Sequence, residues 1–137
     1  MDWFPTLADF AGEADRIPKD RPYDGFNQAA FLLGKQEKSD REHIVTYVGD
    51  RVFAVKWRSM KVHFFTAEST FAPIVEHTFP QAYDIKIDPD EKSELWKGEG
   101  YAHLWVMKPV MGILGSLRSS MQKYPNIQPG QDFDGYE

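Results

Sequence analysis

Three basic side chains in the middle of the chain are candidates for binding an anion. His43, Lys56 and His63 lie in three successive apolar segments between residues 42 and 66. If these segments pair as neighbouring strands, the three side chains form a row that holds one lasting positive charge and two groups titrating near neutral pH. Such a row suits sulfate or an acidic partner. The alternative, which we favour, is a half-buried sheet face whose polar tips reach water.

The remaining histidines and a carboxylate cluster offer weaker chemistry. His77 and His103 stand at no spacing to carboxylates that predicts a metal site, so we expect structural roles for both. The clustered carboxylates are Asp88, Asp90, Glu91 and Glu94. They lack the glycine and terminal glutamate of a calcium loop, which favours a solvated turn. We therefore expect no metal ligands, no catalytic residues and no cofactor.

Residues 42–66 must supply the strands that position the three basic residues. Two-residue turns at Gly49-Asp50 and Ser59-Met60 predict three antiparallel strands. The predicted core face carries Ile44, Phe53, Val55, Trp57, Val62 and Phe64. The predicted second face carries Val45, Tyr47, Val52, Ala54 and Phe65 beside the basic row. A slip of one residue in either turn would exchange the faces of a strand.

Shorter patterns predict the elements around these strands. Residues 2–11 form a helix capped by Asp2 and ended by Gly12, with Trp3, Leu7 and Phe10 on one apolar stripe. Residues 26–33 form a helical turn anchored by Phe31 and Leu32, and residues 82–87 a fourth strand. Residues 103–124 form the main helix, in which Pro109 marks a kink or the first turn. The prediction is a single α+β domain over residues 1–137: a small antiparallel sheet of about four strands packed against a C-terminal helix, a short N-terminal helix and a tail at 125–137.

Composition excludes several classes of protein. The chain holds 16 Lys and Arg against 21 Asp and Glu, and the resulting charge of −5 disfavours nucleic-acid binding. The absence of cysteine excludes disulfides and thiolate chemistry. No apolar run is long enough to span a bilayer, and the first residues lack the basic stretch of an exported precursor. We expect a soluble protein, cytoplasmic by default, without a membrane partner.

Several segments together resemble a known family. They are Trp3-Phe4-Pro5-Thr6-Leu7-Ala8, Asp20-Arg21-Pro22 with Asp24-Gly25, residues 32–42, residues 48–64, and Tyr83-Asp84-Ile85 with Asp88-Pro89. In this order and spacing they resemble the C-terminal region of arylsulfatases, the alkaline-phosphatase-like sulfate ester hydrolases. Residues 1–12 then resemble the last helix of the catalytic domain.

The resemblance implies a scaffold without the family's chemistry. Sulfatases use a formylglycine made from the Cys or Ser of a [CS]-x-P-x-R motif, and a divalent cation held by carboxylates and an Asn. This chain has no Cys, no Ser followed by x-P-x-R, and no adjacent Asp-Asp or Asp-Asn pair. We therefore expect a non-catalytic unit with a scaffold or interaction role.

Three functions stay open. The first is a unit that self-associates or packs on a partner such as a sulfatase catalytic domain, and the second is a part of a sulfate ester hydrolase that acts with a separately encoded catalytic part. The third is a small anion-binding module. Apolar side chains that we expect to be covered by a partner are the predicted interface: Trp3, Leu7, Phe10, Val45, Tyr47, Val52 and Phe65.

Overall fold

The computed structural model describes residues 1–125, apart from the side chain of residue 99. Backbone contacts divide the chain into two compact units, one of Met1–Asp40 with the residues from Ile113 onward, the other of Arg41–Gly112. The prediction of one domain over residues 1–137 stays a prediction, and all of the predicted tail but its first residue lies outside the described residues.

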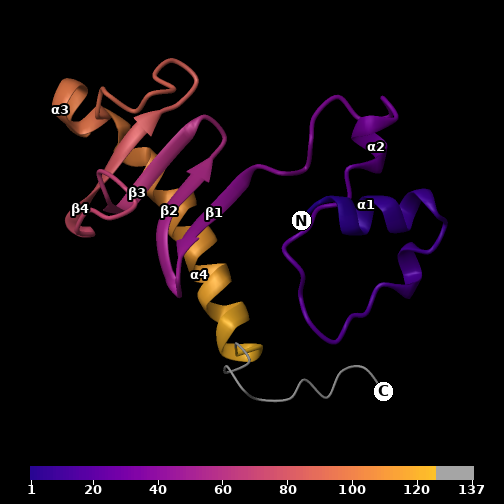
Figure 1. The fold of residues 1–137 in the computed structure, drawn as a ribbon. Helices are drawn as coiled ribbons and strands as arrows, with labels where there is room; N and C mark the ends of the chain where they lie inside the picture. The colour runs from indigo at the N-terminus through magenta and orange to yellow at the C-terminus, as the bar shows by residue number, and fades with distance from the viewer. Residues whose placement is uncertain (126–137) are drawn as a thin grey trace. The chain divides into compact units, whose positions relative to one another are not determined.

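The second unit is built on a four-stranded antiparallel sheet (Figure 1). Its strands are β1 (His43–Val48), β2 (Arg51–Trp57), β3 (Met60–Thr66) and β4 (Val75–Asp84), in that spatial order. Val55, Val62 and Ala82 are fully buried in one row across β2, β3 and β4, and Val45 of β1 completes the row. The predicted α+β class is confirmed: the chain combines this sheet with a C-terminal helix and a short N-terminal helix.

The register of the sheet differs from the predicted one in two places. The second turn consists of Arg58 and Ser59, because Trp57 pairs with Met60. Arg58 adopts a left-handed backbone (φ 53°), and its N–H donates to the carbonyl of Glu42 at 2.8 Å, which holds that turn. In the first hairpin the predicted turn at Gly49 and Asp50 is present, but the pairing shifts by one residue between Thr46 and Tyr47.

The shift in the first hairpin exchanges residues between the predicted faces, whereas the displaced second turn only changes which residues stand opposite each other. Val45, not Ile44, shares the buried row with Val55. Ile44 pairs with Lys56 on the opposite face, so its assignment to the core face was wrong. The physical reason is that side chains alternate along a strand, so an inserted residue reverses the face of everything beyond it.

Helical segments follow the sheet in the second unit. α3 (Leu95–Glu99), which sequence reasoning missed, packs on β4, where the indole Nε1 of Trp96 donates to the carbonyl of Pro80 at 2.6 Å. A 3-10 segment, η2 (Gly100–Val106), leads into α4 (Met107–Lys123), whose residues up to Gly112 belong to this unit and whose remainder belongs to the first. Pro109 therefore lies in the first turn of α4, where its missing N–H costs nothing. The predicted helix over 103–124 began too early. The strand predicted at 82–87 overlaps β4 only at residues 82–84, because β4 begins at Val75 and ends at Asp84.

The first unit contains α1 (Trp3–Phe10), a 3-10 turn η1 (Ala14–Arg16) and α2 (Ala29–Leu32). Thr6 is 1% exposed and joins the two helices: its hydroxyl donates to the carbonyl of Asp2 at 2.6 Å and accepts from the N–H of Gln28 at 2.9 Å. Ala29 is the buried residue of α2, whereas Phe31 and Leu32 are exposed. Their predicted anchoring role was wrong, because so short a helix buries only the side facing α1.

Candidate functional site

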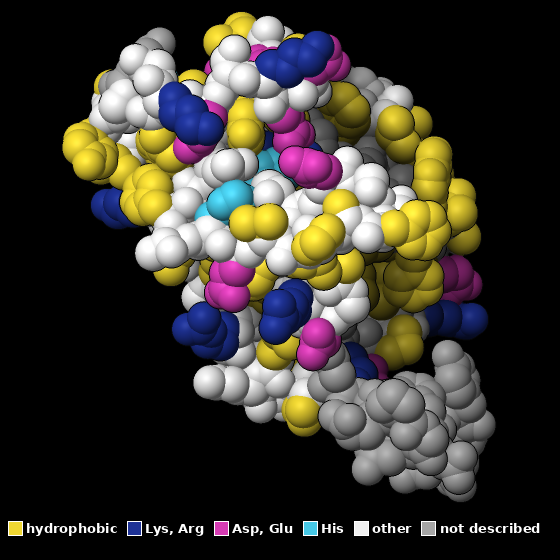
Figure 2. Space-filling view, turned by 60° about the vertical axis from the view of Figure 1, so that its left-hand side comes forward, with side chains coloured by type: hydrophobic (Ala, Val, Ile, Leu, Met, Phe, Trp, Pro, Cys, Tyr) yellow, Lys and Arg dark blue, Asp and Glu magenta, His cyan; other side chains and the backbone are white. Residues whose placement is uncertain are grey.

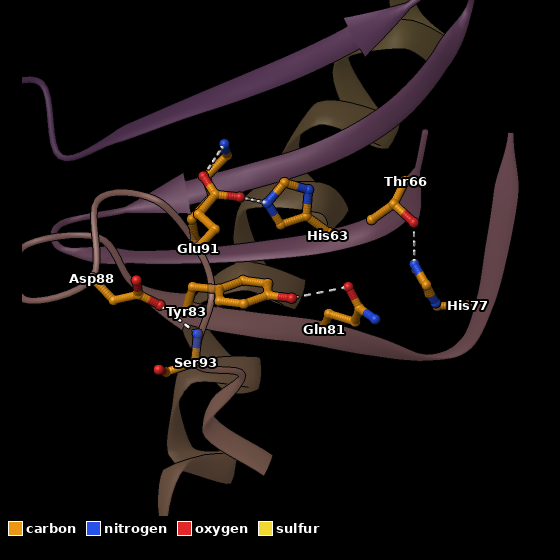
Figure 3. Close-up of polar contacts among 9 residues, drawn as sticks. His63, Thr66, His77, Gln81, Tyr83, Asp88, Glu91 and Ser93 are labelled. Carbon is orange, nitrogen blue, oxygen red and sulfur yellow. Dashed lines mark hydrogen bonds and ion pairs between the residues drawn. The ribbon is translucent and has the colours of Figure 1, made fainter. Parts of the chain in front are cut away.

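A loop carboxylate joins two basic residues of β3 on the face of the sheet opposite to Val55 and Val62. Glu91 Oε1 accepts from Lys61 Nζ at 2.5 Å, and Glu91 Oε2 lies 2.6 Å from His63 Nε2 (Figure 3). Lys61 and His63 share a face because they are two residues apart on one strand. Glu91 reaches them from a left-handed backbone position (φ 55°), which L-residues adopt at a cost.

The surroundings of His63 favour the neutral form of its ring. Burial lowers its pKa below 6.5; Glu91 acts in the opposite direction and Lys61 adds to the lowering, leaving a net decrease. The ring of His63 also meets Tyr83 of β4 edge to face at 5.7 Å. Tyr83 donates its hydroxyl to Gln81 at 3.1 Å, and its pKa is raised, first by burial and then by nearby Glu94. In Figure 2, histidine side chains reach the surface beside acidic ones.

A cavity of about 330 Å³ adjoins this cluster. Its lining consists of Ile44, Thr46, Lys56, Lys61, Ile85, Pro89 and Glu91. The register explains the lining, because Lys56 pairs with both Ile44 and Lys61 across β1, β2 and β3. Two lysines therefore stand directly opposite each other on neighbouring strands.

The predicted basic row is only partly assembled. Lys56 and His63 lie on the same face and in adjacent cross-strand rows, since His63 pairs with Ala54. His43 pairs with Trp57 and thus lies on the other face, so its place in the row was wrong. Sequence reasoning missed Lys61, whose position two residues before His63 was the available signal. It did not link Glu91 to the strands, because nothing local specifies where the loop folds.

The remaining polar candidates have partners of their own, and two of them order the loop after β4. Asp88 accepts from the backbone N–H of Ser93 at 2.7 Å, and Asp90 pairs with Lys92 at 2.8 Å on the surface. His77 contacts the hydroxyl of Thr66 at 2.8 Å. Within residues 1–125, the side chain of residue 99 apart, no three His, Asp or Glu side chains lie together as a metal site requires. No helix in that range combines the length and apolar content needed to cross a bilayer.

The three predicted interface residues on α1 are exposed. Trp3 is 64%, Leu7 55% and Phe10 48% exposed, and their spacing places them on one side of the helix. A cavity of about 300 Å³ opens beside them, lined by Asp2, Trp3, Thr6, Gln28, Phe31, Leu32 and Ser39. The amide oxygen and nitrogen of Gln28 are buried there without a hydrogen-bond partner among the described residues.

The predicted interface residues on the sheet are more covered than those on α1. Val45, Val52 and Phe65 are half-buried, and Tyr47 is 40% exposed. Phe65 stacks on Phe53 with ring centroids 5.4 Å apart. The shifted pairing also removes Val45 from the face of Lys56, where it was expected.

Comparison with known proteins identifies relatives over most of the chain. A family model described as the C-terminal region of aryl-sulfatase matches residues 39–132. Human steryl-sulfatase is 32% identical over 69% of this chain and 20% of its own length, and human arylsulfatase D is 27% identical over 91% and 24%. Among solved structures, the PsFucS1 sulfatase from Pseudoalteromonas sp. is similar with a TM-score of 0.79, 26% identity, and coverage of 93% of this chain and 26% of that one. The chain thus spans a quarter or less of these curated relatives.

Proposed function

The chain belongs to the sulfatase family, as the C-terminal region of an aryl-sulfatase, and from this premise we propose that it is a non-catalytic unit that packs against a sulfatase catalytic part. The matched relatives are about four times as long. The chain holds neither a [CS]-x-P-x-R motif nor any cysteine, so nothing in it can be converted to formylglycine. Hydrolysis of a sulfate ester therefore requires residues supplied by another part, in the same polypeptide or a separate one.

The observation that carries this proposal is that α1 exposes its apolar side chains and buries a polar one. In an isolated helix pair the apolar side of a helix is expected to face inward. Here the inward side carries Thr6, while Trp3, Leu7 and Phe10 face outward. Together with neighbouring Phe4, 55% exposed, they form an apolar surface of a kind that proteins cover with a partner.

The cavity beside α1 supports the same conclusion. The unpaired amide of Gln28 lies in a mostly apolar lining, and a buried amide without partners costs about 1–3 kcal/mol. A partner segment that inserts an apolar side chain and one polar group would satisfy both features. The occupant that we propose is a catalytic part, because the matched relatives carry about three quarters of their length outside the region that this chain covers.

The test mixes the purified chain with a sulfatase catalytic part that lacks its own C-terminal quarter, followed by light scattering on a sizing column. We expect a one-to-one complex for the parent chain and none for Leu7→Asp. The matched control is Ile87→Asp, which places the same charge on an exposed apolar residue of the other unit, 79% exposed, and should leave the complex intact.

Two outcomes would overturn the proposal. Hydrolysis of an aryl sulfate by the purified chain alone contradicts the non-catalytic assignment. The second outcome is a homodimer that Leu7→Asp disrupts, together with no binding of the catalytic part. This result would assign the α1 surface to self-association instead.

A further inference from the structure

Two lysines stand opposite each other on β2 and β3, and only one of them has a carboxylate that compensates its charge. Lys56 and Lys61 are directly paired across the sheet, and like charges at such positions repel. Glu91 neutralises Lys61. Lys56 is half-buried and has no charged partner among the side chains that the structure describes.

The cavity beside the lysines lies where a compensating anion would fit. Lys56 and the hydroxyl-bearing Thr46 both line it, and Thr46 stands two residues from Ile44, the partner of Lys56. Ile44, Ile85 and Pro89 supply apolar walls. At about 330 Å³ the space exceeds that of an inorganic ion and falls within the range of small-molecule sites.

The charges of the lining define the ligand. Lys56 and Lys61 contribute two positive charges and Glu91 one negative charge, so the lining has a net charge of +1. The two carboxylate oxygens of Glu91 already lie against Lys61 and His63, so the charge of Glu91 is partly compensated within the protein. Glu91 contacts the residues of β3, so the end of the cavity beside β1 and β2 is the end where an anionic group would bind.

From this geometry we propose that the cavity between Lys56, Thr46 and the loop at Ile85 binds a small organic monocarboxylate. The carboxylate pairs with Lys56 and accepts from the Thr46 hydroxyl, and the apolar body lies against Ile44 and Pro89. The site replaces the three-residue anion site predicted from the sequence: Lys56 stays, whereas His43 faces the other way and His63 is occupied by Glu91.

The experiment titrates the full chain with benzoate while amide NMR spectra are recorded, with benzamide as the neutral analogue of the same shape. We expect saturable shifts at Ile44, Thr46 and Ile85 with benzoate and none with benzamide. Lys56→Gln should weaken binding about fivefold, the factor that a partly exposed ion pair supplies. Lys86→Gln is the matched control, since Lys86 is an exposed lysine outside the cavity with no charged partner in the part of the chain that the structure describes.

Lys56→Gln also relieves the repulsion with Lys61, so the variant should unfold at an equal or higher urea concentration than the parent. Lost binding therefore cannot be attributed to lost folding. The proposal is overturned by the absence of saturable shifts, by equal shifts with benzamide, by equal weakening in the two lysine variants, or by tighter binding of inorganic sulfate at the same residues. None of these results depends on a catalytic part, so failure here and failure of the α1 interface are distinguishable.

Discussion

Glu91→Ala should lower the free energy of unfolding of the sheet unit. Glu91→Gly should lower it by less. Glu91→Ala deletes the contacts with Lys61 and His63, whose side chains are 28% and 15% exposed. A hydrogen bond to a charged group contributes about 1.5–3 kcal/mol when well shielded. Since these side chains are partly solvated, we discount the loss to about 1–2 kcal/mol.

Glu91→Gly separates the backbone from the side chain. Both variants lose the same contacts, but only glycine adopts the φ of 55° without a steric penalty. The left-handed region costs other residues about 1–2 kcal/mol, so the glycine variant should be more stable than the alanine variant by about 1 kcal/mol.

Urea unfolding at pH 7, followed by both circular dichroism and tryptophan fluorescence, measures these differences if the two probes give coincident transitions. Glu76→Ala is the control, because Glu76 is an exposed carboxylate of β4 with no ion pair in the described range. If Glu91→Ala is as harmless as this control, Glu91 does not hold the loop to the sheet. If the glycine variant is no more stable than the alanine variant, the argument from backbone strain is refuted.

Two further predictions concern other polar groups. Thr6→Val should lower the free energy of unfolding by about 1–3 kcal/mol, because it leaves the N–H of Gln28 without its acceptor. Thr6→Ser keeps the hydroxyl and should retain most of the stability. Equal losses for the two variants in urea titrations would contradict this role of Thr6. Because burial lowers the pKa of His63, the unfolded state binds more protons than the folded one below pH 6.5, so stability should fall as pH drops from 6.5 toward the folded-state pKa. His63→Gln should flatten that part of the stability curve measured by urea unfolding, and an unchanged slope would assign the effect to other groups.

The sequence predicted the class of fold well because strong local patterns specify the strands. Apolar residues between 42 and 66 and the Gly49-Asp50 turn place β1, β2 and β3 within a residue or two. The register was harder, because the irregularity after Thr46 and the left-handed Arg58 depend on hydrogen bonds between distant segments, such as Arg58 to Glu42. The one-residue shift after Thr46 was enough to put Ile44 and His43 on the wrong faces.

The candidate site was less predictable than the sheet. Lys56 could be named as a basic residue in a strand, but its neighbour Lys61 follows only from the true turn. Glu91 comes from a loop 30 residues along the chain from Lys61, and neither periodicity nor charge spacing relates the two. Long-range contacts of this kind are specified by the whole fold.

The bond from Trp96 to the carbonyl of Pro80 has a consequence for how the chain meets other molecules. β4 is an outer strand of the sheet, and an outer strand offers unpaired backbone groups on which another strand can add. At its middle, Pro80 has no N–H to offer and its carbonyl is already bonded to the indole. An incoming strand therefore finds no continuous ladder along β4, and strand-by-strand aggregation through this edge is disfavoured.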